Sequence, residues 1–421
     1  MARFLSRPSG PVRTDDQVRV GLFGRFGSGN VGNDASLEAI LQYLKAERPD
    51  AVLDGLFSEP ERVAARFGLP ATRLSWLRTS KRSRSRLLHA GLTMARIGLG
   101  ALVDAGRTAA WVRRHDVVIV PGMGLLESDL PQRPWEFPYS LLLLSAAGKL
   151  FGTKVALVSV GATVVRQRLT GRMLATAARL AYYRSFRDEQ SLDAARRMGM
   201  AHEGDQVYPD LVFALPTPPV GPGPTGVVGV GVMAYRGTPT DRHRADRILA
   251  EYTEKMTQFV RSLTGAGHKV RLLIGDANDE PVALEILADA RSRRSGPGEL
   301  PVVFEPFSTV DELMAQLGTV DSVVGTRFHT VLVALMLGKP TVAIGYGRKH
   351  VELMNQMGVG DWVQNIRDLD VELLERQVAA LATERDRIIR TLTEREAANR
   401  AWLGEQFAEL TAVLFEPSRV P

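Results

Sequence analysis

The sequence contains no cysteine, and this absence excludes several kinds of chemistry. The chain can have no disulfide framework, no thiol nucleophile and no thiolate metal site. It also lacks the run of about 18 uncharged apolar residues that a membrane-spanning helix requires. Its first residues, MARFLSRPSGPVRTDDQ, hold no continuous apolar core, so they do not predict a secretory signal. Together these absences favour a cytoplasmic protein.

Basic residues are in excess but are not gathered into a stripe. The net charge of +6 comes mainly from arginine, and no dense basic run with interleaved aromatic residues is present. Nucleic-acid binding is therefore not expected. A hydrophobic content of 45% and a charged content of 24% are ordinary for a soluble globular protein. With 421 residues, the chain is long enough for two domains that each have a core.

Strand-like apolar runs alternate with helical patterns along most of the chain. This alternation predicts an α/β protein in which helices cover both faces of parallel sheets. Residues 215–226, LPTPPVGPGPTG, form the best linker, and the pattern restarts after them. We therefore expect an N-terminal αβα domain over residues 1–217 and a C-terminal αβα domain over 226–365, with their sheets facing across a cleft. A helical tail over 366–421 is expected to pack across both domains or to pair with another subunit in a homo-oligomer.

The segment 81–110 combines a basic cluster with a mostly apolar helical pattern. The cations of the cluster are Lys81, Arg82, Arg84 and Arg86. Two interpretations stay open. The segment is either a buried interdomain or core helix, or an interfacial helix that lies on an anionic bilayer. The second interpretation would place the protein peripherally at the inner face of a membrane.

The most informative segment is 322–360, in which a short apolar strand leads directly into an apolar helix. Arg327 and His329 fall on the first turn of that helix. Free backbone N–H groups and the helix dipole already favour an anion at this position. Arginine adds a pair of parallel hydrogen bonds to a phosphate or a carboxylate. The segment therefore predicts an anion site at this sheet edge.

Two further cations are predicted at the same edge. The strand that follows the apolar helix ends just before Lys349. Arg236 follows the first strand after the linker, so it should lie at the carboxyl edge of the same sheet. Ligands in open parallel sheets sit at the carboxyl ends of the strands. The cleft between the domains is therefore the expected active site.

Two loops of the N-terminal half carry polar groups at strand ends. The first contains GxGxxG at glycines 27, 29 and 32, which is a pattern typical of dinucleotide binding. The alternative interpretation stresses Asn30, Asn33 and Asp34, which can bind sugar hydroxyls or cap the following helix. The second loop contains PGMG at residues 121–124, where Gly124 permits close approach of a ligand and Glu127 adds a carboxylate.

These motifs together resemble the polysaccharide pyruvyl transferase family. The matching segments, in the order of the family, are GNVGNDA, PGMG, SVGAT, FRDEQS with YPDLVF, and GTRFHTVLVALMLGKPTVAIGYGRKH. The resemblance implies a fold similar to that of B-type glycosyltransferases. It also implies transfer of pyruvate from phosphoenolpyruvate onto a sugar of a polysaccharide, glycolipid or natural-product glycan, as a cyclic ketal. By this resemblance, Arg327 and His329 fall on the donor-binding motif and Arg236 on a second donor arginine.

The chemistry of such a reaction suggests roles for the candidate residues. The expected donor ligands are Arg236, Arg327, Lys349 and Thr326. The expected acceptor ligands are Asn30, Asn33 and Gly124. His329 is expected to donate or relay a proton to the methylene carbon of the donor, and Asp34 or Glu127 to deprotonate the attacking hydroxyl. Neither a metal nor a cofactor is expected.

Three other functions are compatible with the sequence. A nucleotide-sugar glycosyltransferase of the same architecture would use the same helix start for its diphosphate. A non-catalytic scaffold would use the fold and the long tail for assembly. A nicotinamide-dependent dehydrogenase would use the glycine-rich loop.

Overall fold

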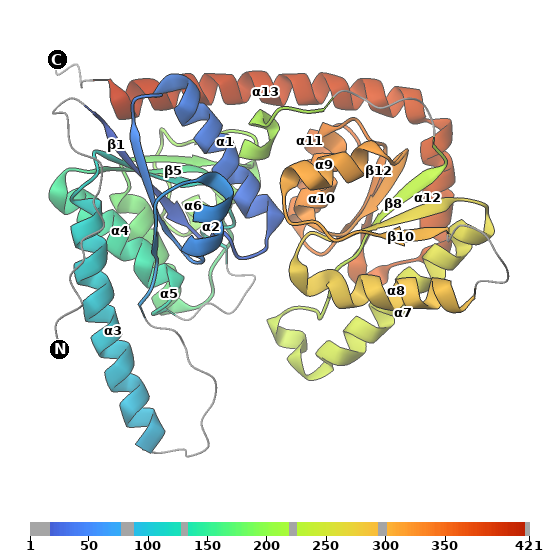
Figure 1. The fold of residues 1–421 in the computed structure, drawn as a ribbon, viewed down its shortest axis with the longest axis horizontal. Helices are drawn as coiled ribbons and strands as arrows, with labels where there is room; N and C mark the ends of the chain where they lie inside the picture. The colour runs from blue at the N-terminus through green and yellow to red at the C-terminus, as the bar shows by residue number, and fades with distance from the viewer. Residues whose placement is uncertain (1–16, 77–87, 128–133, 219–224, 294–300, 417–421) are drawn as a thin grey trace.

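A computed structural model describes residues 17–76, 88–127, 134–218, 225–293 and 301–416 of the chain. The described residues form two parallel β-sheets, each covered by helices and lying side by side in Figure 1. The prediction of an α/β protein with two αβα units is confirmed. The linker predicted over 215–226 joins the two sheets, although residues 219–224 lie outside the described part.

The first sheet has seven strands in the order β3-β2-β1-β4-β5-β6-β7, and all neighbouring strands are parallel. Its strands are β1 (Arg19–Gly24), β2 (Val52–Phe57), β3 (Ala71–Arg73), β4 (Val117–Pro121), β5 (Lys154–Val160), β6 (Tyr183–Phe186) and β7 (Gln206–Val207). The helices of this half are α1 (Val31–Glu47), α2 (Pro60–Phe67), α3 (Leu88–Val112), α4 (Phe137–Phe151), α5 (Arg168–Leu180), α6 (Glu189–Arg197) and the 3-10 helix η1 (Leu211–Ala214).

The second sheet has six parallel strands in the order β10-β9-β8-β11-β12-β13. Its strands are β8 (Val227–Gly231), β9 (Lys269–Leu273), β10 (Val302–Phe304), β11 (Ser322–Gly325), β12 (Thr341–Gly345) and β13 (Val363–Asn365). The helices that follow the linker are α7 (Ala245–Gly265), α8 (Glu280–Ser292), α9 (Val310–Gly318), α10 (Phe328–Met336), α11 (Arg348–Gln356), α12 (Val371–Thr383) and α13 (Arg385–Phe415). The 3-10 helices of this half are η2 (Pro239–Arg244), η3 (Ala277–Asp279) and η4 (Ile366–Asp368).

Both sheets are doubly wound, and each has one point where the winding reverses. In the first sheet this point lies between β1 and β4, and in the second between β8 and β11. The loops that leave two adjacent strands in opposite directions there open a crevice at the carboxyl edge. Strand order alone therefore places the loops after β1, β4, β8 and β11 where a ligand would bind.

Continuous apolar runs explain why the central strands are buried on both faces. Every residue of β4 and of β12 is buried, as expected for parallel strands between two helical layers. Helix α10 is apolar all round, and only His329 among its nine residues is not fully buried. This helix is therefore fixed by packing on all sides, which gives the residues at its N-terminus a rigid support.

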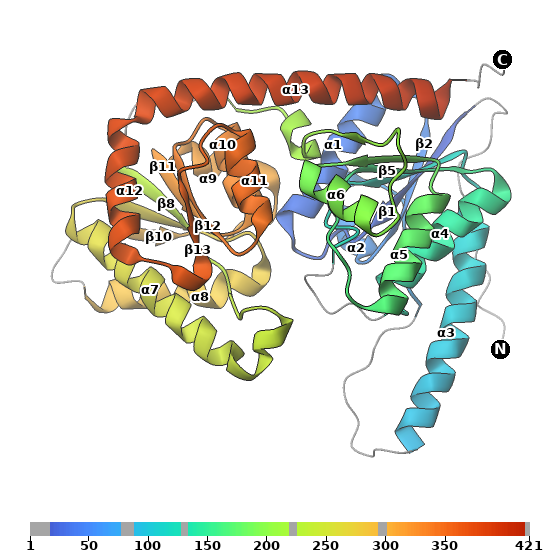
Figure 2. The same cartoon turned by 180° about the vertical axis from the view of Figure 1, so that it is seen from behind.

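The long C-terminal helix α13 crosses both halves of the molecule, as Figures 1 and 2 show. Near its middle, Asn399 accepts a hydrogen bond from Gln356 of α11 at 3.3 Å. Further along, Gln406 donates to Ser185 Oγ at 2.8 Å, and Thr411 bonds Tyr43 of α1 at 2.8 Å. Of the two arrangements expected for the tail, the described contacts are those of packing across both halves.

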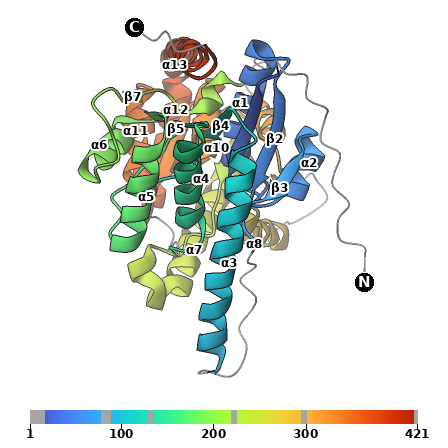
Figure 3. The same ribbon diagram turned by 90° about the vertical axis from the view of Figure 1, so that its left-hand side faces the viewer.

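Helix α3 lies on the outside of the first half, and its N-terminal end projects from the body in Figures 1 and 3. Its C-terminal turns are packed, with Trp111 buried, whereas Leu99 and Leu102 are exposed. It is therefore not a helix between the domains. The predicted basic cluster at residues 81–86 lies outside the described residues, and membrane contact stays a prediction. Among the described helices, none is both long enough and apolar enough to span a bilayer.

A candidate active site between the two sheets

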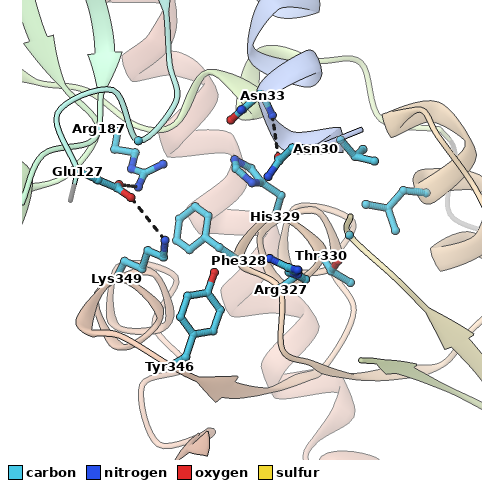
Figure 4. A pocket seen from close by; sticks show the side chains of 14 residues that line it. Asn30, Asn33, Glu127, Arg187, Arg327, Phe328, His329, Thr330, Tyr346 and Lys349 are labelled. Atoms are coloured by element: carbon cyan, nitrogen blue, oxygen red, sulfur yellow. Dashed lines mark hydrogen bonds and ion pairs between the residues drawn. The ribbon is translucent and has the colours of Figure 1, made fainter. Parts of the chain in front are cut away.

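A pocket lies where the carboxyl edges of the two sheets face each other, and Figure 4 shows it from close by. From the first half it is lined by the N-terminus of α1, the loop after β4 and the end of β6. From the second half it is lined by the loop after β9, by α9, by the N-terminus of α10 and by the loop after β12. The lining residues are Asn30, Val31, Asn33, Gly124, Glu127, Arg187, Gly275, Leu313, Arg327, Phe328, His329, Thr330, Tyr346 and Lys349.

Arg327 is at the N-cap position of α10 and lines the pocket while its side chain is paired with Asp279. Its Nε donates to Asp279 Oδ2 at 2.7 Å and its Nη2 to Asp279 Oδ1 at 2.6 Å. The Asp279 side chain is completely buried, and the Arg327 side chain is 24% exposed. The predicted anion ligand is thus at the pocket, but one edge of its guanidinium is used inside the protein.

His329 lies one residue into α10 and packs against the start of α1. A Cβ atom at Gly32 would be 1.9 Å from His329 Nδ1, so only glycine leaves room for the imidazole. Its Nε2 is 3.8 Å from Asp210 Oδ2 of the first half. Burial lowers the pKa of His329 to about 4; Arg187 and Lys349 act in the same direction, and Asp210 acts against them. In the free protein at neutral pH this imidazole is therefore uncharged.

Glu127 lies in the loop after β4 and faces two cations from different halves of the molecule. It accepts a short hydrogen bond from Arg187 at the end of β6. Its Oε2 is 3.7 Å from Lys349 Nζ at the start of α11. Burial alone would raise the pKa of Glu127, but Lys349 and Arg187 together outweigh it and lower that pKa. Glu127 is therefore a carboxylate that links the two halves.

The backbone around Glu127 is built for this close approach. A Cβ at Gly124 or at Gly161 would be 2.4 Å from a carboxylate oxygen of Glu127. Met123 (φ 67) and Ser159 (φ 49) adopt left-handed backbone conformations nearby. Non-glycine residues rarely adopt such angles, and where they occur they often mark functional loops.

Arg187 is the most deeply buried cation of the pocket. In addition to Glu127, it lies 3.5 Å from Asp188 Oδ2 and 3.8 Å from Asp210 Oδ2. Burial lowers its pKa, but the three carboxylates outweigh this and raise it, so the guanidinium stays charged. Its Cζ lies 5.0 Å from the centre of the Phe328 ring, a distance typical of a cation–π contact. Lys349 Nζ lies 5.7 Å from the same ring.

The opposite wall of the pocket carries neutral amides. Asn30 caps α1 by accepting a hydrogen bond from the Asn33 backbone N–H at 3.2 Å. The Asn33 side chain donates to the Arg25 carbonyl at 3.4 Å. Asn30 also forms an isolated antiparallel bridge with Asp276 of the second half, so the amide wall touches the loop after β9.

The structure brings together most of the predicted residues: Arg327, His329, Lys349, Glu127, Gly124, Asn30 and Asn33. The other three do not line the pocket. Asp34 accepts the Gly27 N–H at 2.8 Å and thereby holds the glycine-rich loop. Thr326 is fully buried and donates to the Gly231 carbonyl at 2.9 Å. Arg236 is half exposed and forms an ion pair with Asp246.

Three charged residues of the site were missed at the level of sequence. Arg187 and Asp210 belong to the segments FRDEQS and YPDLVF, which support the family resemblance but gave no residue to the predicted site. An arginine immediately after a buried strand, at the edge where the other loops converge, was the available signal for Arg187. Asp279 had no such signal, since it follows a turn and starts a helix in the way that many caps do.

The arrangement can hold a small anion with more than one charged group. Three cations, Arg187, Arg327 and Lys349, surround the pocket, and each is also paired with a carboxylate. An incoming anion would therefore share cations with internal carboxylates. The amides of Asn30 and Asn33 on the facing wall suit hydroxyl groups. The described residues contain no cluster of three or more potential metal ligands, and independence of metals stays a prediction.

Solved structures of the same overall fold include enzymes that act on sugar nucleotides. A UDP-N-acetylglucosamine 2-epimerase superposes with a TM-score of 0.58 at 13% identity, over 96% of this chain and 98% of that chain. The UDP-GlcNAc 2-epimerase from Methanocaldococcus jannaschii gives 0.54 at 11% identity, over 86% and 92%. The glycosyltransferase SnogD from Streptomyces nogalater gives 0.52 at 16% identity, over 94% and 99%. At such identities the likeness establishes the fold, which is of the B-type glycosyltransferase kind.

A comparison with family models covers both halves of the pocket. The model described as polysaccharide pyruvyl transferase matches residues 30–348, which is more than half of the chain. The match begins at Asn30 on the amide wall and ends at Arg348, beside Lys349 on the cationic wall. The chain therefore belongs to the polysaccharide pyruvyl transferase family.

Proposed function

We propose that the protein transfers pyruvate from phosphoenolpyruvate onto two hydroxyls of one sugar, forming a cyclic ketal. The observation that carries this proposal is the pocket itself, in a chain of this family. One wall presents the cations Arg327 and Lys349, the facing wall presents neutral amides, and an uncharged buried imidazole lies between them. The cationic wall suits a small donor that carries a phosphate and a carboxylate, and the amide wall suits a sugar.

The donor would bind to the cationic wall. Phosphoenolpyruvate carries a phosphate and a carboxylate, which call for separate cations. Arg327 keeps N–H groups directed away from Asp279, and Lys349 can exchange its contact with Glu127 for the donor. Arg187 adds a fixed positive charge from the first half of the molecule. The N-terminus of α10 adds free backbone N–H groups at the same place.

The proton for the reaction would come through His329. Protonation of the methylene carbon gives a methyl group and an oxocarbenium-like carbon, which one sugar hydroxyl attacks as it loses its proton. The second hydroxyl then displaces phosphate, also losing its proton, and closes the ketal. Burial keeps His329 neutral in the free protein, but a bound anion beside it would raise its pKa and allow it to take up the proton that it delivers.

Glu127 is the candidate base for the attacking hydroxyl. Its pKa is held down by Lys349 and Arg187, which makes it a weak base in the free protein. If Lys349 turns to the donor, Glu127 loses one of these cations and becomes more basic. Donor binding would thus prepare the base for the acceptor. Asn30, Asn33 and Gly124 would hold the sugar, as part of a glycan or glycolipid, on the facing wall.

A ligand screen tests the donor. Thermal unfolding would be followed with phosphoenolpyruvate and with sugar nucleotides, because a ligand that binds only the folded state raises the unfolding temperature. We expect stabilisation by phosphoenolpyruvate alone. Lys349→Ala removes a cation that lines the pocket. Its matched control is Arg348→Ala, which removes the adjacent cation, because Arg348 is exposed and does not line the pocket. Only Lys349→Ala should abolish the rise in unfolding temperature caused by phosphoenolpyruvate. An equal loss of this rise in both variants would indicate general electrostatic attraction of the anion rather than binding at the pocket.

The alternative is a nucleotide-sugar-dependent glycosyltransferase. It is favoured by the likeness of the fold to SnogD and to the UDP-GlcNAc 2-epimerases, together with the free N-terminus of α10, which suits a diphosphate. The same screen separates the two functions. Stabilisation by a sugar nucleotide and not by phosphoenolpyruvate would replace the first proposal with the second.

A further inference from the structure

Asp279 is a buried carboxylate that accepts two of its three side-chain hydrogen bonds from the pocket residue Arg327. Its side chain is 0% exposed. Its Oδ1 accepts from Arg327 Nη2 at 2.6 Å and from the Ala234 backbone N–H at 2.9 Å, and its Oδ2 accepts from Arg327 Nε at 2.7 Å. It thereby ties the loop after β8 and the start of α8 to Arg327, which is at the N-cap position of α10.

The geometry of the pair decides which part of Arg327 faces a ligand. A guanidinium has five N–H groups in a plane, and these form one fork along the Nε–Nη2 side and another at the Nη1–Nη2 end. Asp279 occupies the side fork with two parallel bonds, which fixes the plane as well as the direction of the side chain. The end fork stays available, and it is the one that can bind a carboxylate or phosphate bidentately.

The loop after β9 supports the same orientation from a second side. A Cβ atom at Gly275 would be 2.8 Å from Arg327 Cβ and 2.9 Å from its Cγ, so the arginine stem lies directly on this glycine. Asp276, the next residue, forms the bridge to Asn30 on the amide wall. Residues 275–279 thus hold Arg327 in place while touching the opposite wall of the pocket.

We infer that Asp279 is a positioning residue, which holds Arg327 so that only its end fork meets the donor. This rests on the proposed function, in which Arg327 binds the donor anion. Asp279 has two effects on Arg327, neutralisation of its charge and positioning of its side chain, and these have opposite consequences for anion binding. If it only neutralised the arginine, its removal would strengthen anion binding. If it positions the arginine, its removal should weaken that binding.

Asp279→Asn separates the two effects. The amide oxygen could still accept from Ala234 and from Arg327 Nη2, but the amide NH₂ would face the Nε–H, and two donors cannot bond each other. The guanidinium would have to turn away, and the end fork would turn with it. We expect the dissociation constant for phosphoenolpyruvate to rise about tenfold or more, as for the loss of a charge-assisted bidentate contact.

Titration calorimetry with phosphoenolpyruvate would be carried out on the full chain, on Asp279→Asn, on Arg327→Met and on the double variant. If Asp279 acts through Arg327, Asp279→Asn should lower the affinity for phosphoenolpyruvate about tenfold in the wild-type background. In the Arg327→Met background it should lower the affinity no further. A purely structural role would lower affinity by the same factor in both backgrounds and would overturn the inference. Unchanged or tighter binding by Asp279→Asn would also overturn it.

Gly275→Ala provides a second route if Asp279→Asn does not fold. It keeps the Asp279 carboxylate and its charge but pushes on the Arg327 stem. We expect it to weaken phosphoenolpyruvate binding in the wild-type background and to have no effect in the Arg327→Met background; equal effects in both would contradict the inference. Failure of the proposed function has a different signature, because the wild-type protein would then show no phosphoenolpyruvate binding at all, and the inference would fall with it.

Discussion

At the scale of single residues, the pairing of Arg327 with Asp279 changes what an arginine-to-lysine substitution should do. A lysine keeps the charge, but its single ammonium group cannot hold Asp279 through two parallel bonds and present a fork to the donor. Arg327→Lys should therefore resemble Arg327→Ala, with donor affinity lowered about tenfold or more. Titration calorimetry of both variants checks this. Wild-type affinity in Arg327→Lys would mean that the donor makes no forked contact there.

His329 should affect turnover more than donor binding. We expect His329→Ala to lower the maximal rate about a hundredfold or more, because general acid catalysis is lost. His329→Gln can form hydrogen bonds but cannot titrate, so it should be as slow as the alanine variant. Steady-state kinetics with a sugar acceptor would check this. Near-normal turnover in the glutamine variant would show that His329 only holds the donor.

The same glutamine variant tests whether His329 is neutral in the free protein. Its pKa in the folded chain, about 4, lies below the value of about 6.5 in an unfolded chain. Between these values the unfolded state binds more protons, so the contribution of His329 to stability falls as the pH decreases from about 6.5 towards 4. Between pH 7.5 and 5.0 the wild-type protein should lose about 2 kcal/mol more than His329→Gln. Urea unfolding at the two pH values measures this difference, and equal losses would mean that folding does not lower the pKa of His329.

Three of the predicted residues that the structure brings together share one property. Arg327, His329 and Lys349 lie within one continuous segment, whose strand–helix–strand pattern fixes the sheet edge on which they lie. Arg187 and Asp279 come from distant segments and reach the pocket only through the order of strands in the two sheets. A local pattern cannot reveal the contact of Asp279 with Arg327, because an aspartate at the start of a helix is also an ordinary cap.

At the scale of elements, side-chain direction explains why some of the predicted residues do not line the pocket. Asp34 and Asn33 are neighbours on α1, yet the Asp34 side chain turns back to Gly27 while Asn33 lines the pocket. Thr326 and Arg327 are adjacent as well, but Thr326 points into the sheet towards Gly231. The sequence predicts where an element ends, whereas packing determines which of two consecutive side chains faces the ligand.

The contact between α1 and α10 depends on one glycine. Because a Cβ at Gly32 would be 1.9 Å from the His329 ring, Gly32→Ala must displace the imidazole or move the two helices apart. We expect a loss of activity and of stability of about 1–3 kcal/mol, as for an overpacked core position. The matched control is Gly106→Ala in α3, where an added Cβ would meet nothing within 4 Å. Alanine there should stabilise the protein slightly, by about 0.5–1 kcal/mol.

Activity assays and thermal unfolding distinguish the two glycines. The expected result is that only Gly32→Ala loses activity. Full activity in Gly32→Ala would show that the two halves can separate at this point without disturbing His329, and that the close packing seen between α1 and α10 is not needed for the reaction.

At the scale of the whole molecule, the pocket exists only because two separately wound sheets are held edge to edge. Several of the contacts across it are charged or polar: Glu127 with Lys349, Asp210 with His329, and the bridge between Asn30 and Asp276. These are contacts that a ligand can exchange, so they cannot by themselves fix the distance between the halves. Helix α13 provides the lasting connection, because it packs on both halves away from the pocket.

Gln406 is the residue of α13 whose removal should test this connection. It is completely buried, with its Oε1 3.0 Å from Ser159 Oγ and its Nε2 donating to Ser185 Oγ at 2.8 Å. Gln406→Leu would leave both hydroxyls without these partners in a buried place. We expect a loss of about 1–3 kcal/mol in the free energy of unfolding, because Ser159 Oγ would lose its partner, whereas Ser185 Oγ would still accept from the Ser159 backbone N–H. Glu405→Gln, on the exposed face of the same turn, is the control and should be neutral.

The position of Gln406 also allows a prediction about binding. Gln406 does not line the pocket, so well below the unfolding transition Gln406→Leu should bind phosphoenolpyruvate within about twofold of wild type if the two halves remain in register. Urea unfolding and calorimetry on the same samples measure both quantities. A large loss of affinity without loss of stability would mean that the α13 contact directly sets the spacing between the walls of the pocket. The route would be the loop after β5, in which Gly161 lies against Glu127 and Arg187. A loss of stability alone would show that the helix holds the halves together, while the local contacts of the pocket set its geometry.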